Sequence, residues 1–176
     1  MNRPPGRLIA FEGTHGVALG SAARARGAER REDKGCVSVW DASGIFGEVQ
    51  LATVGAGDPS ARTLLLLYAA DLAYRVRAEI RPALAAGRLV VVAPYTATAI
   101  AFARAAGLDA EWAAHVVSFA PQPEQTTLAD APPAEEPAER KGFVEFSARQ
   151  LLKDDDAVDR LDLIRRTRSA LKNQLA

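Results

Sequence analysis

Residues 7–21 of the chain read R-L-I-A-F-E-G-T-H-G-V-A-L-G-S. The first six residues form a nearly continuous apolar run, which is typical of a strand in a parallel sheet that is covered on both faces. Gly13, Gly16 and Gly20 predict a loop after this strand, and we expect a helix over residues 21–34. A strand, a glycine-rich loop and a helix in this order indicate an α/β fold.

The rest of the chain alternates strands with helices. Further strands are expected over residues 36–40, 88–93 and, with a weaker pattern, 125–130, and further helices over residues 60–86, 96–106, 109–119, 142–152 and 157–175. Asp58 or Ser60 is expected to cap the first of these helices, Pro82 to kink it and Gly87 to end it. Residues 42–59 are rich in glycine and are expected to be partly loop, and residues 132–139 to be a short helix or loop.

This alternation predicts a three-layer α/β fold, with a mostly parallel sheet flanked by helices. We expect a single domain over residues 1–176. The chain has 176 residues, 48% of them hydrophobic and 25% charged, so it can bury a sizeable core.

Composition also excludes several classes of protein. The 22 basic and 22 acidic residues give no net charge, which argues against nucleic-acid binding through a strongly basic surface. One cysteine and two histidines exclude an intrachain disulfide and a cysteine-rich zinc site, and no metal site is predicted. The apolar run at residues 64–70 is far shorter than the ~20 residues of a membrane span, and the N-terminus lacks a signal-peptide pattern. We therefore expect a cytoplasmic protein without a membrane partner.

The glycine-rich loop can be compared with the phosphate-binding pattern G-x-x-x-x-G-K-[S/T]. In that loop, backbone N–H groups wrap the phosphates, the lysine reaches the β- and γ-phosphates, and the hydroxyl holds Mg²⁺. Counted from Gly13, the second glycine falls on Ala18, the lysine on Leu19 and the hydroxyl residue on Gly20. Because these positions do not match, the loop taken alone is a plain strand-to-helix turn.

Other motifs accompany the loop. Residues 11–16, F-E-G-T-H-G, resemble the F-E-G-x-[D/E]-G that opens bacterial thymidylate kinases, and residues 65–72, L-L-L-Y-A-A-D-L, resemble their L-L-F-x-A-[D/N]-R helix. Similar motifs follow in the family's order at residues 80–87, 91–95, 98–102, 107–112 and 127–133. The resemblance covers residues 7–140 and implies a P-loop NTPase-like fold. The part of the chain from about residue 141 looks shortened and divergent.

Apolar residues stand where the resemblance implies charged groups. Leu19 replaces the loop lysine, His15 replaces the loop carboxylate, and Leu72 replaces an arginine that helps to hold the thymine base. Ala93-Pro94 replaces the D-R pair of the metal and acceptor-phosphate region, and residues 40–44 lack the arginine of the corresponding family loop. Phosphoryl transfer depends on positioning and on charge stabilisation, and the loss of one such donor costs about 3–4 kcal/mol in other enzymes. We therefore predict a pseudoenzyme with no catalytic residues.

The resemblance also implies where ligands would bind. The nucleotide cofactor would lie on the loop residues Gly13, Thr14, His15, Gly16, Val17, Ala18, Leu19, Gly20 and Ser21. The substrate would contact Tyr68, Leu72, Tyr95, Thr98 and Phe102. Tyr68 stands where the family's phenylalanine stacks on the base, but an aromatic residue on a helical stripe is equally a core residue. Tyr95 and Phe102 leave the same two interpretations open, and His15 either contacts an anion or is a partly exposed polar residue.

Three hypotheses about function follow. The first, which we favour, is a thymidylate-kinase-like protein that has lost phosphoryl transfer. It would act by binding a nucleotide or by pairing as a homodimer or with a related kinase, because the resemblance implies dimers packed through the leucine-rich helix. The second is an active dTMP kinase that uses Arg24 or Arg26 in place of the lysine. The third, a different enzyme on the same scaffold, lacks a visible nucleophile–base pair. ATP and Mg²⁺ are expected as cofactors only if the site still functions.

Overall fold

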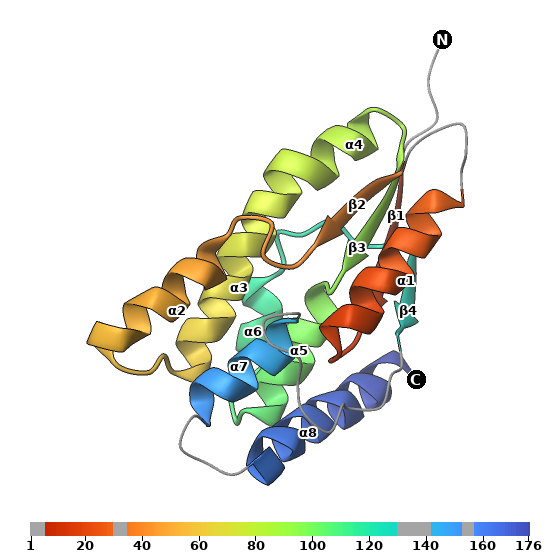
Figure 1. Cartoon of the computed structure of the whole chain (residues 1–176). Helices are drawn as coiled ribbons and strands as arrows, with labels where there is room; N and C mark the ends of the chain where they lie inside the picture. Colours follow the sequence, from red (N-terminus) through yellow and green to blue (C-terminus); the bar gives the residue numbers. More distant parts are fainter. Residues whose placement is uncertain (1–5, 30–34, 130–141, 153–156) are drawn as a thin grey trace.

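A parallel sheet lies at the centre of the computed structural model, which describes residues 6–29, 35–129, 142–152 and 157–176. Its strands are β1 (Arg7–Glu12), β2 (Cys36–Val39), β3 (Leu89–Ala93) and β4 (Gln125–Leu128). They lie in the order β2-β3-β1-β4, and all pairs are parallel (Figure 1). Ile9 of β1 pairs with Val91 on one side and with Gln125 on the other, so β1 is an inner strand.

Helices cover both faces of this sheet. They are α1 (Gly16–Ala28), α2 (Ile45–Ala56), α3 (Ala61–Arg75), the π-helix η1 (Val76–Ile80), α4 (Arg81–Ala85), α5 (Thr96–Ala105), α6 (Ala110–Val116), α7 (Phe143–Leu151) and α8 (Ala157–Leu175). α1 packs on one face through Leu19 and Ala23, which meet Ile9 and Val91. The opposite face carries the larger core, which includes side chains of α3 and α5. Every residue of β3 is buried, as its continuous apolar run predicts, and the three-layer α/β fold is confirmed.

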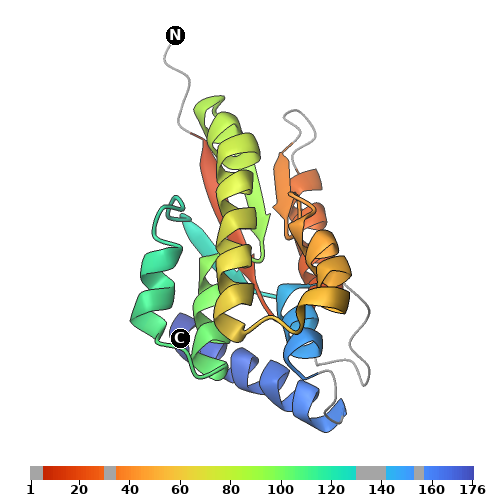
Figure 2. The same ribbon diagram turned by 90° about the vertical axis from the view of Figure 1, so that its left-hand side faces the viewer.

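The α3, η1 and α4 segments form one long rod along the sheet (Figure 2). Ser60 caps its start, because its hydroxyl accepts a hydrogen bond of 3.1 Å from the Thr63 N–H. The irregularity expected at Pro82 lies in the preceding turn, where η1 is a π-helix. Pro82 has no N–H to donate back into the helix, which accounts for a change of hydrogen-bond pattern there. Gly87 ends the rod with a positive φ of 68°.

Two helices differ from the expectations. α1 begins at Gly16 and not at Ser21, because the His15 side chain caps it. α2 lies within residues 42–59, which were expected to be partly loop. Its Phe46 is buried and packs at 4.9 Å, between ring centroids, from Trp40, so tertiary packing outweighs the low helix propensity of the local glycines. The expected segment at 132–139 and the ends of the predicted elements at residues 30–34 and 130 lie outside the described residues.

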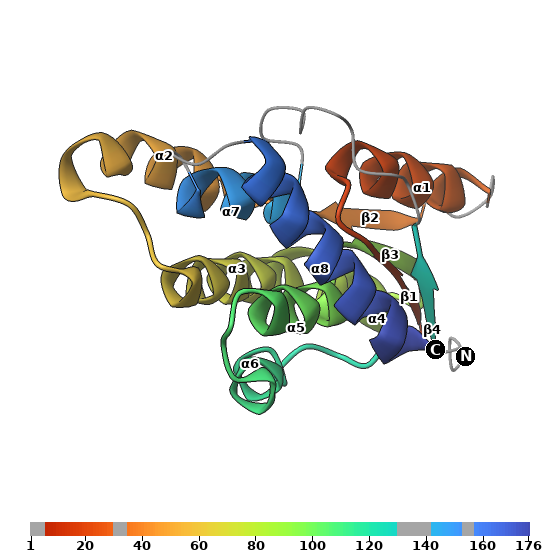
Figure 3. The same cartoon turned by 90° about the horizontal axis from the view of Figure 1, so that it is seen from below.

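The two last helices lie across one end of the sheet. α8 crosses α5, and its buried Leu171 packs against Ala97 and Ala101 (Figure 3). α7 lies between α8 and the start of α1, with nearly all of its side chains buried. None of the helices in the described part of the chain combines the length and the apolar character that a membrane crossing requires.

The buried carboxyl group of Glu12 joins the end of β1 to the start of α5. It accepts hydrogen bonds from the backbone N–H groups of Tyr95, Ala97 and Thr98 at 2.9–3.0 Å. It also accepts a bond of 2.6 Å from the Thr98 hydroxyl, which in turn accepts from the Gly13 N–H at 3.1 Å. Glu12 thereby satisfies N–H groups that a helix start leaves without intrahelical partners. Burial raises the pKa of Glu12 above its ordinary value, although its hydrogen bonds oppose this shift.

A buried ion pair on α3 holds the two neighbouring loops. Asp71 accepts hydrogen bonds from the N–H groups of Asp41 and Ser43, at 3.1 and 3.0 Å, in the loop after β2. Arg75 donates a bond of 3.1 Å to the Pro94 carbonyl, directly after β3. The Arg75 Nε lies 3.0 Å from the Asp71 carboxylate, in an ionic contact whose geometry falls short of a hydrogen bond, and both side chains are fully buried. One turn of α3 thus sets the position of both loops.

We predict that Glu12→Gln destabilises the protein by about 1–3 kcal/mol, because the amide places an N–H₂ group among buried donors. The raised pKa fixes the pH dependence. The folded state holds the Glu12 proton more tightly than the unfolded state. Proton binding at Glu12 therefore adds to the free energy of unfolding, in full below pH 4.5, and this addition is lost as pH rises through the folded pKa. Urea denaturation of the wild type and of Glu12→Gln across this pH range should show that the wild type's advantage in free energy of unfolding shrinks as pH rises. A difference that grows with pH would mean that the folded state lowers the pKa.

A second prediction concerns the ion pair. Asp71→Ala leaves the Arg75 guanidinium buried without its counter-charge, and we expect a loss of about 3–5 kcal/mol. The double variant Asp71→Ala/Arg75→Met should lose less than the sum of the single variants, since it leaves no unpaired charge. Unfolding free energies of the four proteins give the coupling directly. Strictly additive losses would contradict the view that the pair acts as a unit.

Candidate functional site

The glycine-rich loop leads directly into α1. His15 is the cap residue: its Nδ1 accepts a hydrogen bond of 3.2 Å from the Ala18 N–H, and its carbonyl accepts one of 3.0 Å from the Leu19 N–H. The loop is therefore short, and residues 16–21 belong to the helix. Of the nine loop residues expected to bind a cofactor, Gly13, Thr14, Leu19 and Gly20 are buried, His15, Gly16 and Ala18 are half-buried, and Val17 and Ser21 are exposed.

Side chains from elsewhere in the chain accept hydrogen bonds from two N–H groups of this loop. The Gly13 N–H donates to the Thr98 hydroxyl, and the Gly16 N–H donates to Glu145 Oε2 of α7 at 3.0 Å. The second Glu145 oxygen lies 3.8 Å from His15 Nε2, and the Glu145 side chain is only 3% exposed. The start of a helix attracts negative charge because its free N–H groups and its dipole point outward. Here an internal carboxylate satisfies that preference.

Leu19, at the lysine position of a phosphate-binding loop, faces the sheet. It is 2% exposed and packs with Ile9, Val91 and Ala93. A group at this position therefore points into the layer between α1 and the strands, and Leu19 contributes to stability through apolar burial.

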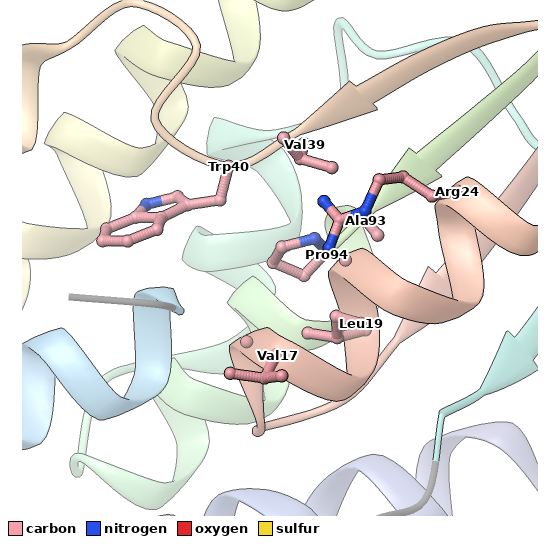
Figure 4. A pocket seen from close by; sticks show the side chains of 9 residues that line it. Val17, Leu19, Arg24, Val39, Trp40, Ala93 and Pro94 are labelled. Carbon is pink, nitrogen blue, oxygen red and sulfur yellow. The ribbon is translucent and has the colours of Figure 1, made fainter. Parts of the chain in front are cut away.

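A cavity of about 300 Å³ lies between the start of α1 and the ends of β2 and β3. It is lined by Gly16, Val17, Leu19, Gly20, Arg24, Val39, Trp40, Ala93 and Pro94 (Figure 4). Among the described residues of this lining, Arg24 has the one cationic side chain. Its guanidinium lies close to Gly20, since a Cβ added there would be 3.2 Å from Arg24 Nη1. Arg26 instead forms an ion pair with Glu29 and does not line the cavity.

The residues expected to contact a substrate are all fully buried, namely Tyr68, Leu72, Tyr95, Thr98 and Phe102. The Tyr68 hydroxyl donates to the Tyr95 carbonyl at 2.8 Å, and burial raises the pKa of both tyrosines. Tyr68 and Phe102 face the same neighbour, the Phe143 ring of α7, at centroid distances of 4.5 and 4.9 Å. Leu72 belongs to the large core, and Thr98 bonds to Glu12.

Sequence reasoning missed four residues of this region. Phe143 and Glu145 reach it from α7, and Asp71 and Arg75 support it from α3. Gly16 and Glu145 are 129 positions apart, so no local pattern connects them. The available signal was a single carboxylate in the otherwise apolar start of a predicted helix, F-V-E-F at residues 143–146.

The donor set at this site matters for metal binding. Within the described residues, no group of three or more His, Cys, Asp or Glu side chains is placed to hold a metal ion. At the end of β3, Ala93 and Pro94 line the cavity with apolar groups. Mg²⁺ prefers carboxylate and other oxygen ligands, and none of the described residues that line the cavity has a side-chain oxygen.

Comparisons with known proteins identify the family. The family model for thymidylate kinase matches residues 41–173, a range that begins after the loop. The thymidylate kinase of Xanthomonas campestris pv. campestris (strain B100) is 32% identical over 132 residues, which cover 74% of this chain and 58% of that protein. A probable thymidylate kinase of Pyrococcus horikoshii is 43% identical over 67 residues, 38% of this chain and 33% of that protein.

The matched part of this chain thus covers between a third and three fifths of the length of these relatives. A crystal structure of thymidylate kinase from Ehrlichia chaffeensis has the same fold, with a TM-score of 0.66, 15% identity, and coverage of 97% of this chain and 87% of that chain. The family match covers well over half of the sequence, and the fold agrees with it. The chain belongs to the thymidylate kinase family.

Proposed function

We propose that this chain has lost phosphoryl transfer and acts by binding. One observation carries the proposal: two N–H groups of the loop that should hold phosphate already donate to side chains of this chain. The N–H groups of Gly13 and Gly16 donate to Thr98 and Glu145, and Leu19 faces the core. A loop that binds a nucleotide needs those N–H groups and a lysine for the phosphates.

The residues of the site also do not fit ATP with Mg²⁺. A phosphate at the start of α1 would meet the Glu145 carboxylate, and like charges so close together repel. At the end of β3, Ala93 and Pro94 offer no side-chain oxygen to a metal and no cation to a phosphate. The relatives are named thymidylate kinases, and transfer of phosphate to dTMP would require several such charges at once.

A second candidate is an active dTMP kinase that uses Arg24 as its phosphate-binding cation. The observation in its favour is the place of Arg24, whose guanidinium lies on the cavity beside Gly20. Arg26 has no such support, since it pairs with Glu29. The two arginines therefore form a matched pair for a test of this alternative.

We predict that the purified protein transfers no phosphate from ATP–Mg²⁺ to dTMP above a protein-free blank. The measurement is a coupled assay of ADP release, run for the wild type, Arg24→Ala and Arg26→Ala. Turnover that Arg24→Ala abolishes and Arg26→Ala leaves unchanged would overturn the proposal and establish the second candidate. Each missing charge costs about 100- to 1,000-fold in rate, so an active site without them should fall below detection.

We further propose that one binding partner is a second copy of this chain, through α3. Leu66, Ala70 and Tyr74 follow one another at four-residue spacing and share a face of this helix. Leu66 and Tyr74 are each 48% exposed, although both are large and apolar or aromatic. The resemblance to the family implies a dimer through the same leucine-rich helix, and this exposed face supports it.

Sedimentation velocity tests this self-association. The wild type should sediment as a dimer at micromolar concentration, and Leu66→Glu/Tyr74→Glu should be a monomer, since each copy would bring two carboxylates into the interface and the like charges would repel. Val158→Glu is the control, because Val158 of α8 is 67% exposed and lies on another helix. A wild type that is a monomer at all concentrations would refute the homodimer. If the chain pairs only with a related kinase, the homodimer is wrong and the heterodimer takes its place as the proposed assembly.

A further inference from the structure

A second cavity, of about 440 Å³, lies at the end of α5 that is remote from the glycine-rich loop. α5 has ten residues, so its two ends lie about 15 Å apart, and Glu12 bonds to its start. α5 and α7 each pack against both α3 and α8, and the cavity takes its lining from all four helices (Figure 3). This lining shares no residue with the cavity at the glycine-rich loop, so the two cavities are separate.

The walls of the second cavity are apolar. Small residues line it where α3 begins and α5 ends, and leucines of α7 and α8 line the rest. Gly107, directly after α5, has a φ of 77°, and a Cβ added there would meet no atom within 4 Å. Leu151 and Leu152 are only half-buried, so an apolar ligand in this space would remove more of their surface from water.

Two arginines, Arg104 and Arg166, bring positive charge to this apolar lining. Arg166 Nη1 donates a hydrogen bond of 2.6 Å to the Ala105 carbonyl, which holds the guanidinium at the end of α5. Its Nε lies 2.8 Å from Asp162, but both side chains are more than half exposed, so this pair contributes little. Arg104 is exposed and has no hydrogen-bond or ion-pair partner among the described residues. None of the described residues of the lining is acidic, so the cavity attracts an anion.

The combination of apolar walls and two cations defines the ligand. Sites for small molecules have volumes of about 300–1,000 Å³ and are mostly apolar, with a few polar groups that orient the ligand. Arginine binds carboxylates through paired N–H···O bonds. Apart from the two arginines, the described residues of the lining have no polar side chain and no aromatic ring, which argues against a nucleotide or a sugar. The chemistry that fits is a hydrocarbon chain with one carboxylate.

We propose that this cavity is a binding site for a fatty acid of medium chain length. Arg104 and Arg166 bind its carboxylate, and Leu151, Leu152 and Leu163 pack against its hydrocarbon chain. The site goes beyond the proposed function and does not depend on it, because none of its residues belongs to the glycine-rich loop. Phosphate transfer to dTMP would therefore overturn the proposed function and leave this proposal intact.

Titration calorimetry with decanoate, below the concentration at which it forms micelles, tests this site. Decanol has the same chain length without the charge, and acetate has the charge without the chain. We expect decanoate to bind at least tenfold more tightly than decanol, since hydrogen bonds between charged groups are the stronger ones. Acetate should give no measurable binding, because it lacks the apolar surface that the cavity would bury. Equal affinities for decanoate and decanol would overturn the role of the arginines.

Substitutions locate the binding. Arg104→Gln and Arg166→Gln should each weaken decanoate binding about tenfold and leave decanol binding unchanged. Arg165→Gln removes the same charge from an exposed position of α8 outside the lining, and should change neither affinity. Ala106→Leu fills the cavity and should abolish the binding of both ligands. Its control is Ala25→Leu, at an exposed position of α1.

Arg24→Gln separates this cavity from the one at the glycine-rich loop, which Arg24 lines. Decanoate affinity should be unchanged in this variant, and a loss would overturn the proposal because it would place the ligand at the loop. Absence of decanoate binding by the wild type would also overturn it, as would binding that Arg104→Gln and Ala106→Leu both leave unchanged. If Ala106→Leu lacks a single unfolding transition, Arg104→Gln decides, because Arg104 is exposed and its substitution breaks no contact between described residues.

Discussion

The buried carboxyl group of Glu12 is the interaction on which the arrangement of the site depends. It ends the inner strand β1 and receives four hydrogen bonds from the start of α5. Because Thr98 also bonds to Gly13, the loop before α1 and the turn after β3 are held by one group. Asp71 and Arg75 then attach the loop after β2 to the same region. Charged groups near this site therefore stabilise loops, and Arg24 is the cation that lines the cavity.

The fold could be predicted because its signals are local. The apolar runs of β1 and β3 and the turn residues between elements predicted a parallel sheet with helices, and the structure confirms this. The predicted start of α1, at residue 21, was wrong. Histidine is not among the favoured cap residues, so His15 was not recognised as the cap. α2 was not predicted because its glycines lower helix propensity, whereas the packing of Phe46 on Trp40 depends on residues distant from any helical pattern.

The site was predictable only in part. The sequence shows that Leu19, Leu72 and Ala93 stand where charges were expected, and the structure places all of them in the core. The internal partners of the loop were not predictable, because Gly16 and Glu145 are joined by tertiary structure alone. Arg75 was hidden for another reason: a buried arginine on a helix cannot be told from an exposed one by its spacing.

The internal hydrogen bonds and the missing charges are two aspects of one constraint. A strand, a tight turn and a helix always leave backbone N–H groups at the turn, and a buried N–H without a partner is costly. A chain that binds phosphate can satisfy these groups with its ligand. A chain that has lost the lysine must satisfy them from within, and Thr98 and Glu145 do so here. Under the proposed loss of phosphoryl transfer, the apolar framework of the family persists because a carboxylate of the chain bonds to the loop in the place of a phosphate.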